Sequence, residues 1–345
     1  MTTDDTSTRG FGLGPMPGTD MAVAAEIVLG ENSDLPAFPE LPARGVGHDS
    51  VGRTAVLLEG LNVEPGPRGW RLCTRPQLLT RRAMDGVESD LDICGDVWGS
   101  GIGKLKIQII GPWTLASAVE LPNGHRAVTD PGALRDLTGA LVHGTLTHVA
   151  DVRRRFGADI VVQVDEPLLD TVCRGRLRGT SDYESIPAVA APDAADRLRV
   201  LTDGLRGAGV PEVLLNLSAA PPLWEVAGRC GANTVLLNAR HVVGSRQLDG
   251  LGAAVSGGIR MGLGAIPVRA PGFPEAGELN EYSRDTAVRI ARLWDELGLH
   301  RNLLTTMVDV HPCGGLSSVP VSIAARVLAT ARTVAVMLAR DAGDL

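Results

Sequence analysis

Residues 308–315 combine three side chains that can do chemistry: a carboxylic acid, an imidazole and a thiol. They follow an apolar run that predicts a buried strand over residues 303–310. Alternate side chains of a strand share a face, so Asp309, His311 and Cys313 are expected to point the same way. Enzymes built from strands and helices place their chemistry at such strand ends. A solvated strand tip carrying an unrelated cysteine is the alternative.

Polar side chains, or turns made by proline and glycine, also follow the other predicted strands. They lie at residues 14–16, 111–114, 165–167, 216–218, 238 and 267–269. Most of these ends close runs that are otherwise apolar. Burying a polar group costs free energy unless the group is paired, so a purely structural sheet gains nothing from polar ends that point inward. The strand ends together are therefore the candidate site.

Three of these side chains each have two interpretations. Asp165 could hold a substrate ammonium or act as a general acid or base, or it could cap the following helix through backbone amides. For Glu166 the favoured interpretation is structural, either as a helix cap or as the ion-pair partner of an arginine. Trp113 could stack on a flat ligand, or it could close the mouth of the fold by hydrophobic packing, which is the commoner use of tryptophan.

The composition limits the classes of protein to which the chain can belong. It has 345 residues, of which 44% are hydrophobic, and this suits one large domain or two small ones with a sizeable core. The net charge is −7, and no basic patch is interleaved with aromatic residues. Nucleic acid is therefore not expected as a partner.

The cysteines and the hydrophobic pattern predict a cytoplasmic protein. The five cysteines, at positions 73, 94, 173, 230 and 313, have wide spacing and no CxxC pair, which suits a reducing compartment. Residues 1–10 are polar, lack the apolar segment of a signal peptide, and are expected to be disordered. No apolar run reaches about 18 residues, so no membrane span is expected.

Strands and helices alternate along the chain. Strands are expected from residue 11 and over 104–110, 160–164, 212–217, 234–237, 259–266 and 303–310. Helices are expected over 21–29, 50–61, 75–91, 130–156, 193–208, 222–230, 246–252, 279–297 and 319–339. About eight repeated units predict an α/β fold, a (β/α)8 TIM barrel formed as one domain by residues 11–345. A doubly wound sheet is the alternative, weakened because residues 12–14 lack the rest of a dinucleotide fingerprint.

The motifs at the strand ends resemble a known family. They are Gly-Leu-Gly-Pro-Met-Pro-Gly-Thr-Asp at 12–20, Asp-Ser-Val-Gly-Arg at 49–53, Gly-Pro-Trp-Thr-Leu-Ala at 111–116, Val-Gln-Val-Asp-Glu-Pro at 162–167 and His-Pro-Cys-Gly-Gly-Leu at 311–316. The chain resembles the C-terminal catalytic barrel of cobalamin-independent methionine synthase, particularly its short, single-barrel actinobacterial relatives. The similarity runs from about residue 11 to about residue 340.

The resemblance implies a (β/α)8 barrel that moves a methyl group to the thiol of homocysteine. In that family a zinc ion at the strand ends binds the thiol as a thiolate and so makes it nucleophilic. The methyl donor is a folate such as methyltetrahydrofolate. In short relatives it can be a methylcorrinoid carried by a partner protein. These donors, a small-molecule substrate and such a partner are therefore expected here, each as an implication of the resemblance.

The family's zinc ligands are largely replaced in this sequence. The ligand positions fall on Asn216, Ser218, Asn238 and Cys313, and only the last can bind zinc well. Zinc is therefore not expected. The replacements keep small polar groups, which indicates a site that was rebuilt and not abandoned. A different metal set is the alternative, and it consists of Asp309, His311, Cys313 and His241.

Further positions also correspond to residues of the family. Asp165 is retained, and in the family this residue lies near the amino group of homocysteine. Pro15 stands where the family usually has serine, and Arg269 stands at the position of a histidine proton donor. Substrate contacts are expected from Met16, Trp113, Glu166, Asn216, Ser218, Asn238 and Arg269.

These positions predict a methyltransferase with a diverged, zinc-free site and a small amino-acid-like or other nucleophilic acceptor. Catalysis is assigned to Asp165 and Cys313, with His311 as base; Cys313 as an inherited residue without a partner is the alternative. A lyase or isomerase whose substrate is held by Asp165 and Arg269 is a second reading. A descendant that binds a ligand or partner protein without catalysis is a third.

Overall fold

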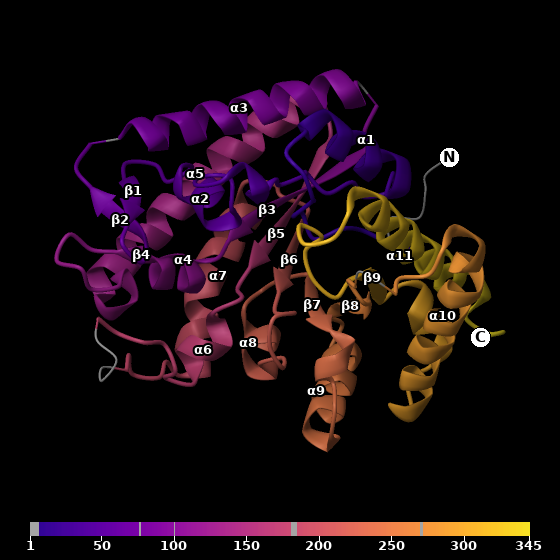
Figure 1. The fold of residues 1–345 in the computed structure, drawn as a ribbon. Coiled ribbons are helices and arrows are strands. Elements are labelled where there is room, and N and C mark those ends of the chain that lie inside the picture. Colours follow the sequence, from indigo (N-terminus) through magenta and orange to yellow (C-terminus); the bar gives the residue numbers. More distant parts are fainter. Residues whose placement is uncertain (1–6, 76, 100, 181–184, 270–271) are drawn as a thin grey trace.

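The computed structural model describes residues 7–75, 77–99, 101–180, 185–269 and 272–345. Its centre is a curled sheet of parallel strands in the order β3-β5-β6-β7-β8-β9 (Figure 1). These strands are β3 (Lys104–Ile110), β5 (Asp159–Asp165), β6 (Glu212–Asn216), β7 (Thr234–Asn238), β8 (Arg260–Ile266) and β9 (Val308–Pro312). The strand order follows the chain order and has no reversal, unlike a doubly wound sheet. The predicted α/β fold is confirmed as a parallel half-barrel.

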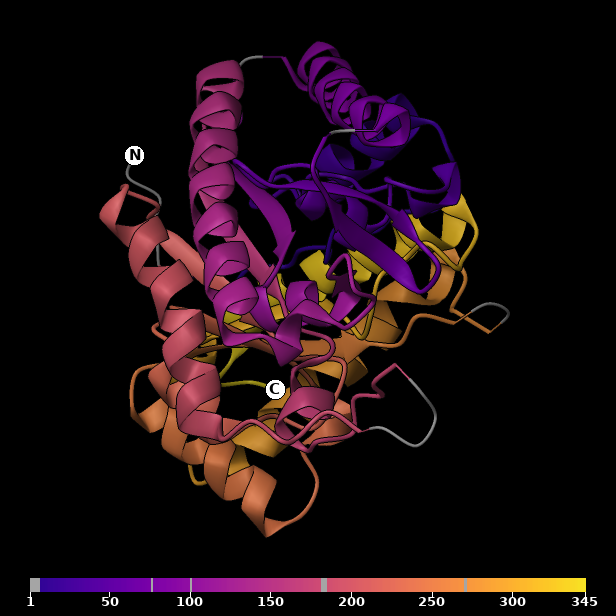
Figure 2. The same cartoon turned by 90° about the vertical axis from the view of Figure 1, so that its left-hand side faces the viewer.

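Helices surround the outside of the curled sheet (Figures 1 and 2). They are α1 (Met21–Glu31), α2 (Ser50–Ala55), α3 (Leu78–Trp98), α4 (Pro112–Ala118), α5 (Pro131–Phe156), α6 (Leu169–Cys173), α7 (Ala191–Gly207), α8 (Trp224–Arg229), α9 (Ser245–Ser256), α10 (Leu279–Glu296) and α11 (Val321–Asp341). Two predicted helix starts are confirmed by their caps. The carboxylate of Asp20 accepts from the amides of Ala22 and Val23, and that of Asp130 accepts from Ala133.

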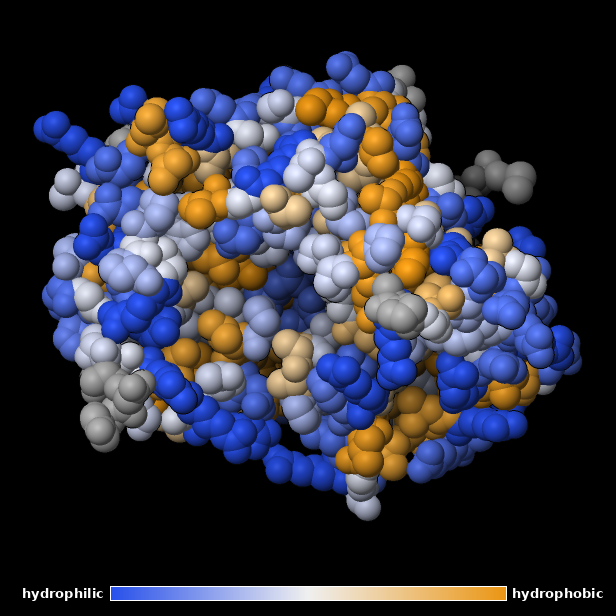
Figure 3. All heavy atoms as spheres, viewed as in Figure 1, coloured by the Kyte–Doolittle hydropathy of each residue, from blue (hydrophilic) through white to orange (hydrophobic). Residues whose placement is uncertain are grey.

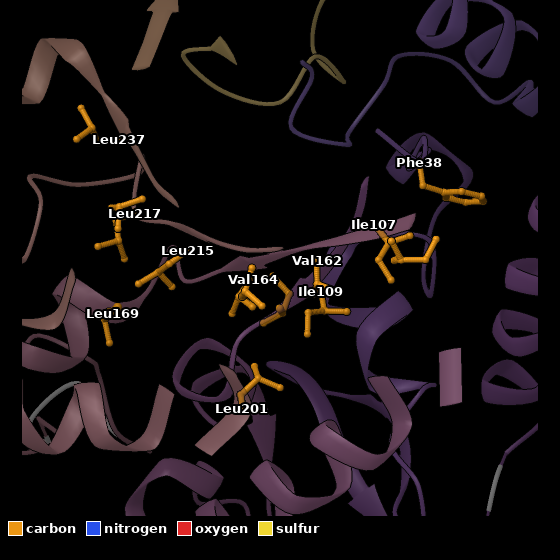
Figure 4. Packing of buried hydrophobic residues seen from close by; sticks show 14 of the residues in the cluster. Phe38, Ile107, Ile109, Val162, Val164, Leu169, Leu201, Leu215, Leu217 and Leu237 are labelled. Carbon is orange, nitrogen blue, oxygen red and sulfur yellow. The ribbon is translucent and has the colours of Figure 1, made fainter. Parts of the chain in front are cut away.

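The pleat of the strands divides the core into two parts. Side chains such as Ile107, Ile109, Val162 and Val164 face outward and pack together under the helices (Figure 4). The residues between them face the inside of the curl, where a small apolar cluster lies. This cluster consists of Phe11, Leu13, Leu35, Val161, Leu214 and Leu236. Because the outward face is filled by hydrophobic residues, polar side chains of these strands can gather only on the inside.

Two extended segments near the start of the chain connect the edges of the sheet. Phe11 donates to the carbonyl of Val310 in β9, at 3.1 Å, and Phe38 donates to the carbonyl of Lys106 in β3, at 2.7 Å. Residues 14–16 and 40 bond to each other as well. These contacts are isolated bridges and not full strands. The six strands thus confirm a parallel half-barrel, and closure into a (β/α)8 barrel stays a prediction.

The region from residue 62 to residue 73 differs from the prediction. It forms an antiparallel hairpin of β1 (Asn62–Gly66) and β2 (Gly69–Cys73), and β2 also pairs with β4 (Val119–Glu120). Proline and glycine in this stretch hide the alternation that would predict strands, and pairing with β4 is a long-range contact. Residues 301–305 are a 3-10 helix and not part of the last strand. The helix predicted from residue 75 begins at Leu78, and residue 76 lies outside the described residues.

One helix in the described part of the chain, α11, is long and apolar enough by length and composition to cross a membrane, although half of that stretch is buried. It packs against β9, α1 and α10, as a core helix does. At the start of the chain, residues 1–6 of the segment predicted to be disordered lie outside the described residues. Thr8 and Arg9 of the same segment are buried.

Arg9 belongs to an ion-pair network at the amino-terminal end of the sheet. Its guanidinium lies 2.7 Å from a carboxylate oxygen of Asp309 and 2.7 Å from one of Glu212. Arg260 contacts the other oxygen of Asp309 at 2.6 Å. Asp309 is fully buried, and the two arginines hold the pKa of its carboxyl below the usual range despite that burial. Asp309 is therefore paired inside the protein, and the catalytic face predicted for it is not formed.

We predict that Asp309→Ala strongly destabilises the protein, because it leaves two mostly buried arginines without their counter-charge. The expected loss of unfolding free energy is about 3–5 kcal/mol in urea titrations at neutral pH. Since the carboxyl pKa is lowered on folding, this contribution is present above about pH 4 and is lost in more acidic solution. The control is Asp136→Ala, whose side chain is 63% exposed. Equal losses in the two variants would contradict a structural role for Asp309.

Candidate functional site

The carboxyl ends of the parallel strands meet at one edge of the sheet, and two cavities open there. Ile110, Asp165 and Asn216 are in register across β3, β5 and β6. The Asp165 cavity, of about 440 Å³, is lined among others by Pro15, Asp165, Asn216, Ser218, Arg240 and Cys313. The arginine cavity, of about 620 Å³, is lined among others by Asn238, Arg240, Arg269, Arg289 and Cys313. Figure 3 shows a hollow with hydrophilic residues near the centre of one face.

Asp165 is the carboxylate that the structure places in a cavity wall. It is 9% exposed, and its Oδ1 accepts hydrogen bonds from Gln163 Nε2 and Asn216 Nδ2, both at 2.7 Å. Asn216 is held in turn, because its side-chain oxygen accepts from the backbone amide of Ser218 at 3.0 Å. No bond from the described residues reaches Asp165 Oδ2. One oxygen is thus fixed and the other is available to a ligand.

A buried lysine lies behind this carboxylate. Lys106 is fully buried, and its ammonium donates to Gln163 Oε1 at 2.6 Å, so Gln163 connects Lys106 to Asp165. Burial lowers the pKa of Lys106. Burial also raises the pKa of Asp165, and the charge of Glu40 raises it further, while Asn216 and Lys106 act in the opposite direction. The raised pKa gives Asp165 the proton affinity that a general base needs near neutral pH.

Glu166, in contrast, makes hydrogen bonds that have a structural role. Its carboxylate accepts from the backbone amides of Trp113 and Thr114, at 2.9 and 2.8 Å, and from the Thr114 hydroxyl at 2.7 Å. It therefore caps α4, which belongs to the preceding strand–helix unit. Burial raises the pKa of Glu166 to about 7, against the lowering effect of these bonds. A Cβ on Gly111 would lie 2.4 Å from Glu166 Oε1, which explains why glycine precedes Pro112.

Trp113 and Met16 are not placed as the predicted substrate contacts. Trp113 is 4% exposed, and its indole donates to the carbonyl of Ala194 in α7 at 3.0 Å. Met16 is 3% exposed and belongs to the hydrophobic core. Neither lines the two cavities. Trp113 follows the packing alternative, because its ring is directed into the layer of helices and away from the strand ends.

His311 and Cys313 do not form the predicted base and nucleophile. His311 is fully buried, and its ring nitrogens lie 2.7 Å from the carbonyl of Pro312 and 3.2 Å from that of Gly262. Burial lowers its pKa to about 4. The Cys313 thiol donates to the carbonyl of Gly264 at 3.1 Å, and burial raises its pKa even though Arg240 and Arg269 lower it. A protonated thiol without a base is a weak nucleophile.

The positions of the family's zinc ligands do not fit zinc. Asn238 donates from its amide to the carbonyl of Cys313 at 3.1 Å and accepts from the amide of Arg240 at 3.2 Å, so its side chain is used to hold two loops. Asn216 is used in the same way beside Asp165 and Ser218. Cys313 is then the sole thiolate donor among the four, and amide or hydroxyl groups bind zinc poorly.

The alternative metal set is also not brought together. Asp309 is paired with arginines at the opposite end of the sheet, and His311 is bonded to two carbonyls. His241 lies beyond the strand end, where its Nε2 accepts from Arg240 at 3.3 Å. Within the described ranges, no group of three His, Cys, Asp or Glu side chains could hold a metal ion.

The structure also identifies site residues that the sequence analysis missed. Arg240 and Arg289 join Arg269 around the arginine cavity. Gln163 and Lys106 support Asp165. Gln163 carries a local signal, because it lies two residues before Asp165 on the same face of β5. The arginines carry none, since they come from a turn, a loop and a helix that are far apart in sequence.

Comparison with known proteins supports the fold. At the level of sequence, the chain matches no protein family and no curated protein. Among solved structures, it is similar to a methyltransferase from Methanosarcina mazei, with 13% identity, a TM-score of 0.52, and 95% of this chain and 94% of that one covered. It is also similar to a B12-independent methionine synthase from Shewanella sp. W3-18-1, with 12% identity, a TM-score of 0.51, and 84% and 77% covered. The chain thus has a fold distantly like that of these enzymes.

We predict that Glu166 and Gly111 are energetically coupled. Glu166→Ala leaves buried donors unpaired, and Gly111→Ala forces a methyl group against the carboxylate, so each should cost about 2 kcal/mol of unfolding free energy. The double variant should lose at least about 1 kcal/mol less than the sum, because the clash disappears with the carboxylate. Urea unfolding of all four proteins measures this coupling. Gly139→Ala in α5, where a Cβ meets nothing within 4 Å, is the control, and additive losses would contradict the contact.

We predict that His311 makes the protein less stable in acid. The folded-state pKa of about 4 is below the unfolded value of about 6.5, so only the unfolded chain binds a proton between these values. His311 should therefore remove about 3 kcal/mol of stability as the pH falls from about 6.5 to about 4. Unfolding free energies across this range should fall less steeply in His311→Asn than in the unmodified protein. Parallel curves would show that His311 titrates normally.

Proposed function

We propose that this protein is a methyltransferase-like enzyme that transfers a methyl group to a small, amino-acid-like nucleophile without zinc. The acceptor would bind in the Asp165 cavity. The observation that carries the proposal is Asp165 itself, a carboxylate fixed through Oδ1 by Gln163 and Asn216, with Oδ2 left for a ligand. The distant similarity of the fold to a methyltransferase and to a methionine synthase supports the reaction class.

The proposal includes a (β/α)8 barrel formed as one domain by residues 11–345. Support comes from the bridges near residues 10 and 37, which connect β9 and β3, the two edges of the six-stranded sheet. In such a barrel the inside is a packed core and the site lies at the carboxyl ends of the strands. The Asp165 cavity lies at these strand ends, and the segment before α1 contributes Leu13 and Pro15 to its wall.

The chemistry of the Asp165 cavity suits an acceptor that carries both charges of an amino acid. Asp165 would hold its ammonium group. Arg240, a cationic side chain in the lining of the same cavity, would hold its carboxylate. For an amine acceptor, the ammonium would first pass a proton to Asp165, and the lone pair freed on nitrogen would then form the new bond to the methyl carbon. The bond between the methyl carbon and the donor would break, with its electron pair leaving on the donor.

The donor in this proposal is methyltetrahydrofolate or a methylcorrinoid delivered by a partner protein. Zinc has no part in it, because the residues at the ligand positions do not fit the metal. A cytoplasmic setting is part of the same proposal, and the five free thiols support it. A lyase or isomerase is the second candidate, favoured by a base of raised pKa near the arginines that line the neighbouring cavity.

The test compares Asp165→Asn with Asp159→Asn, a matched control at the opposite end of the same strand, β5. Purified proteins would be incubated with methyltetrahydrofolate or methylcobalamin and a panel of amino-acid amines and thiols, and methylated products measured by mass spectrometry. We expect transfer by the unmodified protein and the control, and a loss of about 100-fold or more in kcat/KM for Asp165→Asn.

Other outcomes would point to the other candidates. Turnover of an amino acid without any methyl donor would favour the lyase or isomerase. Equal transfer rates for Asp165→Asn and Asp159→Asn would remove Asp165 from the mechanism. Saturable binding of an amino acid without turnover under any condition would favour a non-catalytic binding protein.

A further inference from the structure

The arginine cavity is lined by three cationic side chains, although the chain as a whole carries a net negative charge. Its volume is about 620 Å³, and it lies between the ends of β7 and β8 and the helix α10. Arg240, Arg269 and Arg289 are in its lining, and none of the other described residues in that lining is an aspartate or glutamate. The chain as a whole carries a net charge of −7, so the positive charge of this lining is opposite in sign to the net charge of the protein. Such a cavity concentrates anions.

The three arginines are also not neutralised from outside the cavity. Elsewhere in the fold, arginines such as Arg155 and Arg301 lie within 3 Å of carboxylates. Among the described residues, no carboxylate forms an ion pair with Arg240, Arg269 or Arg289. Their guanidinium groups therefore retain donors for a ligand, and guanidinium forks bind carboxylates and phosphates in two-pronged geometry.

Local contacts hold two of these arginines, Arg289 through its side chain and Arg240 through its backbone. Arg289 donates through Nη2 to the hydroxyl of Thr286 at 2.7 Å, and Thr286 is itself buried and lines the same cavity. The backbone amide of Arg240 donates to the side chain of Asn238 at 3.2 Å. The charges of Arg240 and Arg269 both act to lower the pKa of the Cys313 thiol, which also lines the cavity. The three arginines thus line the same cavity although they come from separate elements.

The remaining wall is hydrophobic. Leu263, Val268, Ile290 and Leu293 line the cavity together with Pro267. A site for a free inorganic ion needs no such surface, whereas an organic anion can bury its carbon skeleton against it. The lining therefore provides two kinds of contact, with guanidinium groups for anionic groups and aliphatic side chains for an apolar body.

We propose that the arginine cavity is a binding site for a small organic molecule with an apolar body and at least two negative charges, carried by carboxylate or phosphate groups. Arg240, Cys313 and Gly314 line both this cavity and the Asp165 cavity, so the ligand would lie directly beside the proposed acceptor. The site stands on the geometry and charge of the cavity and does not require that methyl transfer takes place.

The test measures binding of two dianions on a benzene ring by isothermal titration calorimetry with the full chain at low ionic strength. Isophthalate presents two carboxylates and phenyl phosphate presents one doubly charged phosphate, so the pair distinguishes the two anion types. Benzyl alcohol is the neutral probe. We expect saturable binding of at least one dianion, no binding of benzyl alcohol, and weaker binding as salt is added.

Variants locate the site. Arg269→Gln and Arg289→Gln should each raise the dissociation constant about tenfold or more. Arg284→Gln is the matched control, an exposed arginine on α10 that does not line the cavity, and it should bind as the unmodified protein does. The side chains of Arg269, Arg284 and Arg289 are all exposed, so their variants should fold. Arg289→Lys keeps the positive charge and should therefore retain part of the affinity.

Two results would overturn the proposal. One is the absence of saturable binding for both dianions. The other is binding that Arg269→Gln and Arg289→Gln leave unchanged, because the dianion would then occupy another part of the protein. The assay needs no turnover, so its result is independent of the outcome of the methyl-transfer experiment.

Discussion

The candidate site depends on a chain of polar side chains inside a hydrophobic sheet. Lys106, Gln163, Asp165 and Asn216 come from three neighbouring strands and are joined by hydrogen bonds of 2.6–2.7 Å. Burying charges costs several kcal/mol unless they are paired or bonded. Gln163 offsets this cost for both charges, because its side-chain carbonyl accepts from Lys106 and its side-chain amide donates to Asp165. This arrangement fixes one oxygen of Asp165, while burial and the charge of Glu40 raise the pKa of its carboxyl against the lowering effect of these partners.

The last strand shows how one face can serve different purposes. Asp309 and His311 alternate along β9 and Cys313 follows directly after it, but successive members of such a series are about 6.6 Å apart along a strand. Asp309 therefore reaches the arginines at the amino-terminal end, and His311 reaches carbonyls in the buried middle. Cys313 alone arrives at the cavities. A shared face places side chains in line, and their depth in the sheet decides their surroundings.

The two cavities at the strand ends differ in charge and meet at Arg240, Cys313 and Gly314. Asp165 supplies a negative charge to one, and three arginines give the other a positive potential. An enzyme that joins two substrates needs adjacent sites of different chemistry. The arrangement at the ends of β5 to β9 is consistent with that need, and the hydrophobic wall beside α10 favours an organic ligand over a simple ion.

The sequence by itself determined the alternation of strands and helices, the caps at Asp20 and Asp130, and Asp165 as a carboxylate at a strand end, because these features depend on local patterns of a few residues. Only the tertiary structure decided that Glu166 caps the helix of the preceding unit, that Trp113 packs under α7, and that three distant arginines share a cavity. The physical reason is that a side chain's role follows from its partners. In a parallel sheet those partners come from neighbouring strands and loops that are separated by whole helices in the chain.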